Sequence, residues 1–118
     1  MARILVIDDE QEVRLVLQKV LTDAGHDVVS ASDGADGLKQ FRASPADLVI
    51  TDLYLPNQEG IETMRQLRME GPDVPIIVIS GHPDAGAVLA VARWLGAAAT
   101  LTKPFSSEDL LSAVVTAL

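Results

Sequence analysis

Short apolar runs rich in β-branched residues recur along this 118-residue chain, and segments with helical spacing separate them. The runs at residues 3–7, 47–51 and 75–80 are almost continuously apolar, as expected of strands that are covered on both faces. Weaker strand patterns occupy 27–31 and 98–102. Since strands that alternate with helices are joined by right-handed crossovers, the chain is predicted to fold as a parallel sheet between two layers of helices.

Two of the separating segments have apolar residues at helical spacing, so each predicts a helix with one buried face. The apolar positions are Val13, Val16, Leu17 and Val20 in the first segment, and Val88, Val91, Ala92 and Leu95 in the second. Gly25, Gly71 and Gly96 each follow a helical segment, where a left-handed C-terminal cap favours glycine. Ser106 is expected to cap the last helix. Five strands and five helices are therefore expected to form one domain over residues 1–118.

Charge and composition limit the partners of the chain. It contains no cysteine, so neither a disulfide nor a thiolate metal site is available. Its formal net charge of −8 argues against direct binding of a nucleic-acid backbone or an anionic membrane, because both need a basic surface. The sequence shows no basic and apolar leader at its start, and we expect a cytoplasmic protein whose partners are proteins or cations.

Polar residues gather where the predicted strands end. They are Asp8 and Asp9 after the first strand, Asp52 after the third, Ser80 at the end of the fourth and Lys103 after the fifth. In an open parallel sheet, the functional crevice lies beyond the carboxyl ends of the strands. We therefore expect these side chains to meet at one edge of the sheet.

The acidic run of Asp8, Asp9 and Glu10 needs a positive partner, because like charges about 4 Å apart repel by roughly 4 kcal/mol at an effective dielectric constant of about 20. Carboxylates from two strand ends form a hard, oxygen-rich site, and Mg2+ accepts such ligands together with water and phosphate oxygens. A simpler interpretation is a charge bias at the N-terminus of the first helix. That interpretation weakens when Asp52 is expected at the same edge.

An aspartate in such a site can act as a nucleophile toward phosphorus. Mg2+ and the ammonium group of Lys103 would stabilise charge on the transferred oxygens, and Ser80 would add a hydroxyl donor. An acyl phosphate on Asp52 would attract both side chains and bias the nearby loops, as in a phosphorylation switch.

These residues resemble the receiver domain of two-component response regulators, over nearly the whole chain. The motifs that carry the resemblance, in the family's order and spacing, are DDE at 8–10, DLYLP at 52–56, Gly60, ISG at 79–81 and TKPF at 102–105. The resemblance implies an α/β fold of the flavodoxin-like (βα)5 type, a doubly wound sandwich whose parallel strands take the order 2-1-3-4-5.

The resemblance also implies a role for each site residue. Asp52 would accept a phosphoryl group from a histidine kinase or a histidine phosphotransfer protein. Asp9 and Asp52 would bind Mg2+ directly, together with the backbone carbonyl of Tyr54. Asp8 would act on the metal mostly through water.

On the same grounds, Lys103 would pair with the phosphate, Ser80 would be the switch hydroxyl, and the Lys103–Pro104 peptide bond would be cis. The chain would be a regulatory phosphoacceptor and not an enzyme, although it would promote its own phosphorylation and dephosphorylation. Phosphorylation would change the surface of the fourth helix, fifth strand and fifth helix. Through this surface the domain would control an output domain or form a homodimer.

Three other functions fit parts of the pattern. A metal-dependent phosphohydrolase usually carries its nucleophile and acid in one D-x-D unit after the first strand, where this chain has DDEQ at 8–11. A flavin-binding protein would need a phosphate cradle rich in Ser, Thr and Gly at the same place. The third alternative is a degenerate receiver that acts as a phosphorylation-independent interaction module, although every residue type of the phosphorylation site is retained.

The chain departs from the family at the second switch position. Thr100 occupies the place where the family usually carries Tyr or Phe, so no aromatic ring is available to rotate there. Tyr54 and His82 lie two residues after the phosphoacceptor and the switch hydroxyl, at positions that modulate attack by water in this family. We hypothesise that these two bulky side chains obstruct an in-line water and lengthen the lifetime of the phosphate.

Tyr54→Ala is therefore expected to speed the loss of the phosphoryl group, because water would reach the phosphorus more easily. The decay of the phosphorylated protein in a buffer that contains Mg2+ measures this rate. An unchanged or slower decay would contradict the hypothesis.

Overall fold

The structure is a computed structural model that describes residues 1–53, 60–81, 90, 92–93 and 95–118. Its strands form one parallel sheet in the order β2-β1-β3-β4-β5, which confirms the order that the resemblance implies. The strands are β1 (Arg3–Ile7), β2 (Asp27–Ala31), β3 (Leu48–Asp52), β4 (Ile76–Ser80) and β5 (Ala99–Thr102). Each boundary lies within one residue of the expected range.

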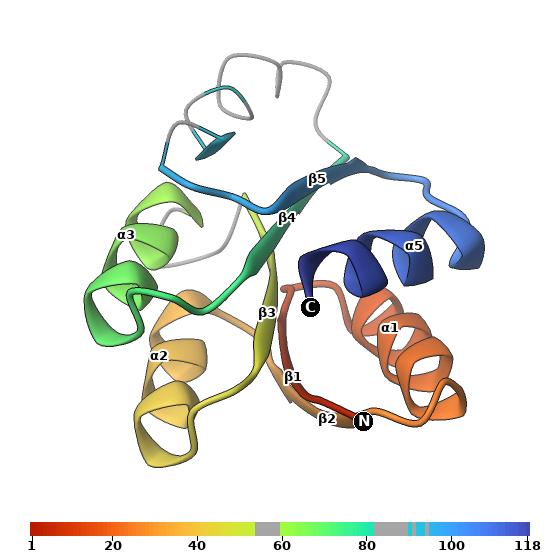
Figure 1. Ribbon diagram of the computed structural model, residues 1–118, viewed down its shortest axis with the longest axis horizontal. Helices are drawn as coiled ribbons and strands as arrows, with labels where there is room; N and C mark the ends of the chain where they lie inside the picture. The colour runs from red at the N-terminus through yellow and green to blue at the C-terminus, as the bar shows by residue number, and fades with distance from the viewer. Residues whose placement is uncertain (54–59, 82–89, 91, 94) are drawn as a thin grey trace.

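Two layers of helices cover the sheet. The helices of the described residues are α1 (Gln11–Asp23), α2 (Gly34–Ala43), α3 (Gly60–Glu70) and α5 (Ser107–Ala117). Helices α1 and α5 lie on one face of the sheet, and α2 and α3 lie on the other (Figure 1). The helix expected around Val88–Leu95 falls largely outside the described residues, although residues 90, 92 and 93 have helical backbone. None of the described helices is long and apolar enough to cross a membrane.

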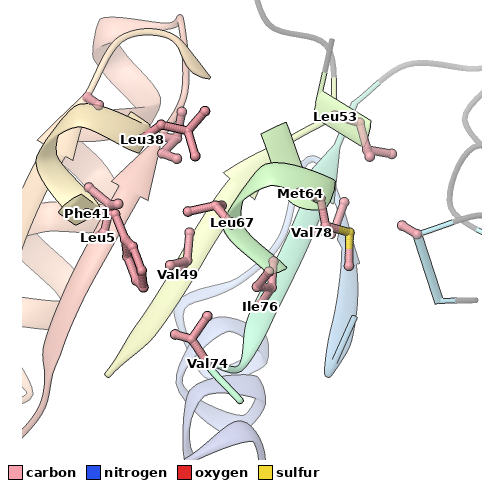
Figure 2. Packing of buried hydrophobic residues seen from close by; sticks show 13 residues of the cluster. Leu5, Leu38, Phe41, Val49, Leu53, Met64, Leu67, Val74, Ile76 and Val78 are labelled. Carbon is pink, nitrogen blue, oxygen red and sulfur yellow. The ribbon is translucent and has the colours of Figure 1, made fainter. Parts of the chain in front are cut away.

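The sheet divides the hydrophobic core into two clusters, because alternate side chains of a strand point to opposite faces. Leu5 and Val49 belong to the cluster under α2 and α3, which Figure 2 shows from close by. Their neighbours in sequence, Ile4 and Leu48, belong to the cluster under α1 and α5. Both faces of the central strands are therefore buried, and this explains why the sequence shows apolar runs in place of an apolar and polar alternation.

Helix α1 buries most of the predicted stripe, but its buried face is shifted toward Leu21 and leaves Val16 outside. Leu17 and Leu21 are fully buried, whereas Val16 is 56% exposed. Val13 and Val20 lie at the edges of the contact and are half-buried. The prediction that Val16 points into the core was wrong: successive helical residues are about 100° apart, so with Leu17 against the sheet its neighbour turns toward solvent.

Two of the three predicted glycine caps are present. Gly25 and Gly96 have φ angles of 95° and 94°, the left-handed conformation expected at these positions. Gly71 has no positive φ, so the cap prediction was wrong there. A β-carbon at Gly71 would lie 2.8 Å from Cζ of Phe41, and the glycine therefore makes room for packing against α2. Ser106 caps α5 as expected, because its Oγ accepts a hydrogen bond from the backbone N–H three residues later, at 3.0 Å.

Arg68, in the last turn of α3, joins two loops at the amino-terminal edge of the sheet. Its Nη1 donates to the backbone oxygen of Val74, before β4, at 2.5 Å. Its Nη2 donates to the backbone oxygen of Gly96, before β5, at 3.1 Å. A single guanidinium group therefore satisfies carbonyl groups from two successive connections and fixes where β4 and β5 begin.

Leu17→Ala is expected to lower the free energy of unfolding by about 2–5 kcal/mol, because the change removes buried methyl groups and leaves a cavity. The adjacent Val16→Ala is the matched control, with an expected change below about 0.5 kcal/mol for an exposed position. Urea unfolding followed by circular dichroism measures both values. Equal losses from the two substitutions would contradict the observed orientation of α1.

Candidate functional site

The carboxyl ends of β1, β3, β4 and β5 bring the predicted polar residues to one edge of the sheet. Asp8 directly follows β1, and Asp52 is the last residue of β3. Ser80, the last residue of β4, lies opposite Thr102 of β5, which directly precedes Lys103. Residues that are far apart in the sequence thus share one rim, as the parallel topology requires.

Lys103 lies at the centre of this rim. Its Nζ is 2.7 Å from Oδ2 of Asp52, 3.0 Å from Oδ2 of Asp8 and 3.0 Å from Oε1 of Glu10. Partial burial opposes the charged form of the lysine, but hydrogen bonds to Asp52, Glu10 and Asp8 outweigh this effect and raise the pKa of Lys103 above its ordinary value. The side chain is therefore a fixed positive charge at neutral pH.

The side chain of Asp8 is fully buried, and only one of its two carboxylate oxygens accepts a well-aligned hydrogen bond within the described residues. Its Oδ1 accepts a hydrogen bond from the backbone N–H of Glu10 at 2.8 Å. Its Oδ2 accepts no well-aligned hydrogen bond within the described residues, although the ammonium group of Lys103 lies 3.0 Å away. Burial raises the pKa of Asp8 from 3.8 to about 6, because it outweighs the opposing effects of the Glu10 backbone hydrogen bond and the nearby ammonium group of Lys103.

The loop that carries Asp8 is fixed by contacts of its backbone. The backbone N–H of Asp8 donates to the oxygen of Ala31 at the end of β2, at 3.1 Å. Nη1 of Arg14 in α1 donates to the backbone oxygen of Asp8 at 2.7 Å. The sequence interpretation missed this role of Arg14. The available signal was a basic residue one helical turn after the acidic run.

Gly60 fixes the chain just after Asp52. Its backbone N–H donates to the oxygen of Leu53 at 2.8 Å. A β-carbon at this position would collide with the backbone of Leu53, so the start of α3 can approach the end of β3 only through a glycine. The motif glycine therefore has a packing reason that concerns the site directly.

The donor set fits a small divalent cation. One carboxylate oxygen from each of Asp8, Asp9, Glu10 and Asp52 lies within 4.8 Å of the others. Exposed acidic groups gather in many proteins without a metal, but the buried Oδ2 of Asp8 faces this cluster without a well-aligned donor. Hard oxygen ligands, with Asp9 and Glu10 open to water, suit Mg2+, which keeps several waters of its own.

The other predicted site residues are distributed as follows. Ser80 is fully buried at the end of β4. Thr100 is half-buried in β5, and its hydroxyl accepts a hydrogen bond from Nη2 of Arg93 at 3.2 Å. The Lys103–Pro104 peptide bond is cis. The residues expected to modulate the site that lie outside the described part of the chain are Tyr54, including its backbone carbonyl, and His82.

The fold and this rim define a class of protein. A family model described as the response regulator receiver domain matches residues 4–115. The chain belongs to this family, the receiver domains of two-component response regulators, and the predicted family and flavodoxin-like fold are confirmed. Receiver domains are the regulatory phosphoacceptors of two-component signal transduction.

Individual relatives show how much of a protein the chain represents. The alkaline phosphatase synthesis transcriptional regulatory protein PhoP of Bacillus subtilis is 37% identical over 108 residues, which cover 92% of this chain and 45% of PhoP. The response regulator MprA of Mycolicibacterium vanbaalenii is 37% identical over 110 residues, which cover 93% of this chain and 47% of MprA. The chain therefore spans less than half the length of these relatives.

Solved structures give the same fold over the full length. The chemotaxis response regulator CheY4 of Vibrio cholerae superposes with a TM-score of 0.92 at 29% identity, covering 100% of this chain and 99% of that protein. A response regulator receiver domain protein from Clostridium thermocellum superposes with a TM-score of 0.87 at 34% identity, covering 99% of this chain and 94% of that one.

The raised pKa of Asp8 predicts how stability depends on pH without a divalent cation. Between pH 3.8 and about 6 the folded state binds more protons at Asp8 than the unfolded state does, so this group lowers stability as the pH rises. Asp8→Asn removes that loss and is expected to be more stable than the wild type by about 1–3 kcal/mol near pH 8, with the difference vanishing near pH 4.

Urea unfolding in the presence of EDTA, repeated across this pH range, measures the difference. A wild type that gains stability relative to Asp8→Asn as the pH rises would contradict the direction of the pKa shift.

Proposed function

We propose that this receiver domain accepts a phosphoryl group on Asp52 from a phosphohistidine of a histidine kinase or a histidine phosphotransfer protein. It would act in the cytoplasm as a regulatory phosphoacceptor, and it would not turn over a separate substrate. The observation that carries the proposal is the 2.7 Å contact between Nζ of Lys103 and Oδ2 of Asp52. A cation is thus already in place beside the carboxylate that would receive the phosphoryl group.

The chemistry is a displacement at phosphorus. A carboxylate oxygen of Asp52 forms the new bond to phosphorus while the bond to the donor's imidazole nitrogen breaks, and the electron pair returns to that nitrogen. The ammonium group of Lys103, which already lies beside this carboxylate, would stabilise charge on the transferred oxygens. Ser80, at the end of the neighbouring strand, would donate its hydroxyl to the new group.

The metal ligands would be Asp9, Asp52 and the backbone carbonyl of Tyr54, with Asp8 acting mostly through water. Mg2+ bound there would supply a positive charge that neutralises the phosphoryl oxygens. Two observations support this assignment: the clustered carboxylate oxygens and the buried Oδ2 of Asp8 that lacks a well-aligned donor. Both features would favour an additional cation beside Lys103.

The output would pass through the strand that precedes Lys103. The backbone N–H of Lys103 donates to the oxygen of Ser80 at 2.8 Å, so the ends of β4 and β5 are linked beside the site. A phosphoryl group that attracts both side chains would act on this link. We propose that the surface of the fourth helix, β5 and α5 responds and contacts an output domain or a second copy of the chain.

Incubation with acetyl phosphate and Mg2+ is expected to add one phosphoryl group to the wild type, and Asp52→Asn is expected to abolish the adduct. Intact mass spectrometry detects it. Beryllofluoride with Mg2+ should change the emission of Trp94, the only tryptophan, in the wild type but not in Asp52→Asn.

Two negative results of this phosphorylation experiment would lead to different conclusions. An equal adduct on Asp52→Asn would show that another residue is the acceptor. A wild type that acquires no adduct and shows no emission change would favour the phosphorylation-independent interaction module.

A further inference from the structure

Glu10 makes a contact that its place at the start of α1 does not require. It is the N-cap residue of α1, yet its side chain forms no capping hydrogen bond. Its Oε1 instead lies 3.0 Å from Nζ of Lys103, 93 positions later in the chain. Because the Glu10 side chain is 60% exposed, this contact is made on the solvent side of the acidic cluster.

The other two partners of Lys103 belong to the proposed metal site. The ammonium group contacts Oδ2 of Asp8 and Oδ2 of Asp52. A divalent cation bound by Asp9 and Asp52, with Asp8 reached mostly through water, would repel the ammonium group and would compete with it for the lone pairs of Asp52. On this view Lys103 would withdraw in part when the metal binds, and a carboxylate outside the Asp8 and Asp52 pair would give it a place to withdraw to.

We propose that Glu10 is a positioning residue, which holds the Lys103 ammonium group at the solvent side of the cluster and thereby leaves Asp8 and Asp52 accessible to Mg2+. This inference rests on the proposed function, because it concerns the metal and the lysine of that same site. Without Glu10, the lysine keeps only the two carboxylates that the metal also needs. The competition between lysine and metal then becomes stronger.

Calorimetric titration of the unphosphorylated protein with MgCl2 tests the role of Glu10. Glu10→Gln is expected to raise the Mg2+ dissociation constant roughly 3- to 10-fold, at or below the range of about 10- to 100-fold typical of residues that orient metal ligands. Glu10→Asp keeps the charge but is one methylene too short for the 3.0 Å contact, so it should weaken binding to a similar degree. Glu12→Gln is the matched control, because Glu12 is an exposed acid of the same helix turn and makes no ion pair with Lys103 among the described residues.

A second background separates positioning from simple loss of negative charge. If Glu10 acts by holding the lysine, Glu10→Gln should change the dissociation constant much less in a Lys103→Gln protein than in the wild type. If Glu10 acts only through its charge, the change should be as large or larger there, because no ammonium group shields it. A Glu10→Asp protein with wild-type affinity, or an undiminished effect in Lys103→Gln, overturns the proposal.

The titration also separates this proposal from the proposed function. Mg2+ binding is measured before any phosphoryl transfer, and circular dichroism of each variant verifies that it is folded. A wild type that binds Mg2+ with the expected variant effects, yet acquires no phosphoryl group, supports the role of Glu10 and contradicts the phosphoacceptor assignment. A wild type that binds no Mg2+ overturns both.

Discussion

The ammonium group of Lys103 holds together three parts of the sheet edge that are remote in the sequence. It contacts the loop after β1 through Asp8 and Glu10, and the end of β3 through Asp52. The carboxylates of Asp8 and Asp52 are close enough for the charge of one to raise the pKa of the other. Without a cation between them, these two carboxylates would repel each other. The geometry of the site therefore depends on this one positive charge.

The site is arranged at a cost to the stability of the fold. Asp8 is a buried acid whose neutral form is favoured by its surroundings, and one of its oxygens has no well-aligned donor in the described structure. Replacement of such a group by a neutral one would leave the local backbone in place, since the backbone of Asp8 is held by the oxygen of Ala31 and the guanidinium group of Arg14. A buried polar atom without a full set of hydrogen bonds is the kind of local exception that is expected at functional sites.

Much of the fold could be predicted from the sequence, because buried strands appear in it as apolar runs and because strand patterns alternate with helical ones. The position of the site could also be predicted, because the carboxyl ends of parallel strands lie at the same edge of a sheet. The errors concern local geometry. Helical spacing did not show that Leu17 faces the sheet while Val16 faces solvent. Gly71 is required for close packing and does not adopt the left-handed backbone conformation that was predicted. The spacing of Arg14 from the acidic run was a usable signal, whereas the contact between Glu10 and Lys103 depends on the conformations of two long side chains that are remote in the sequence.

The hydrogen bonds of Arg68 to the backbone of Val74 and Gly96 also bear on the stability of β5. β5 is an edge strand, and an edge strand is the part of a sheet most open to fraying and to pairing with a foreign chain. Arg68 bonds the backbone just before it, and Lys103 is anchored to carboxylates just after it. Charged side chains therefore hold the chain on both sides of β5: Arg68 at the amino-terminal edge of the sheet and Lys103 at the carboxyl-terminal edge. A loss of the Lys103 contacts would therefore leave the carboxyl end of β5 without these side-chain partners, while Arg68 would still hold the connection that precedes the strand.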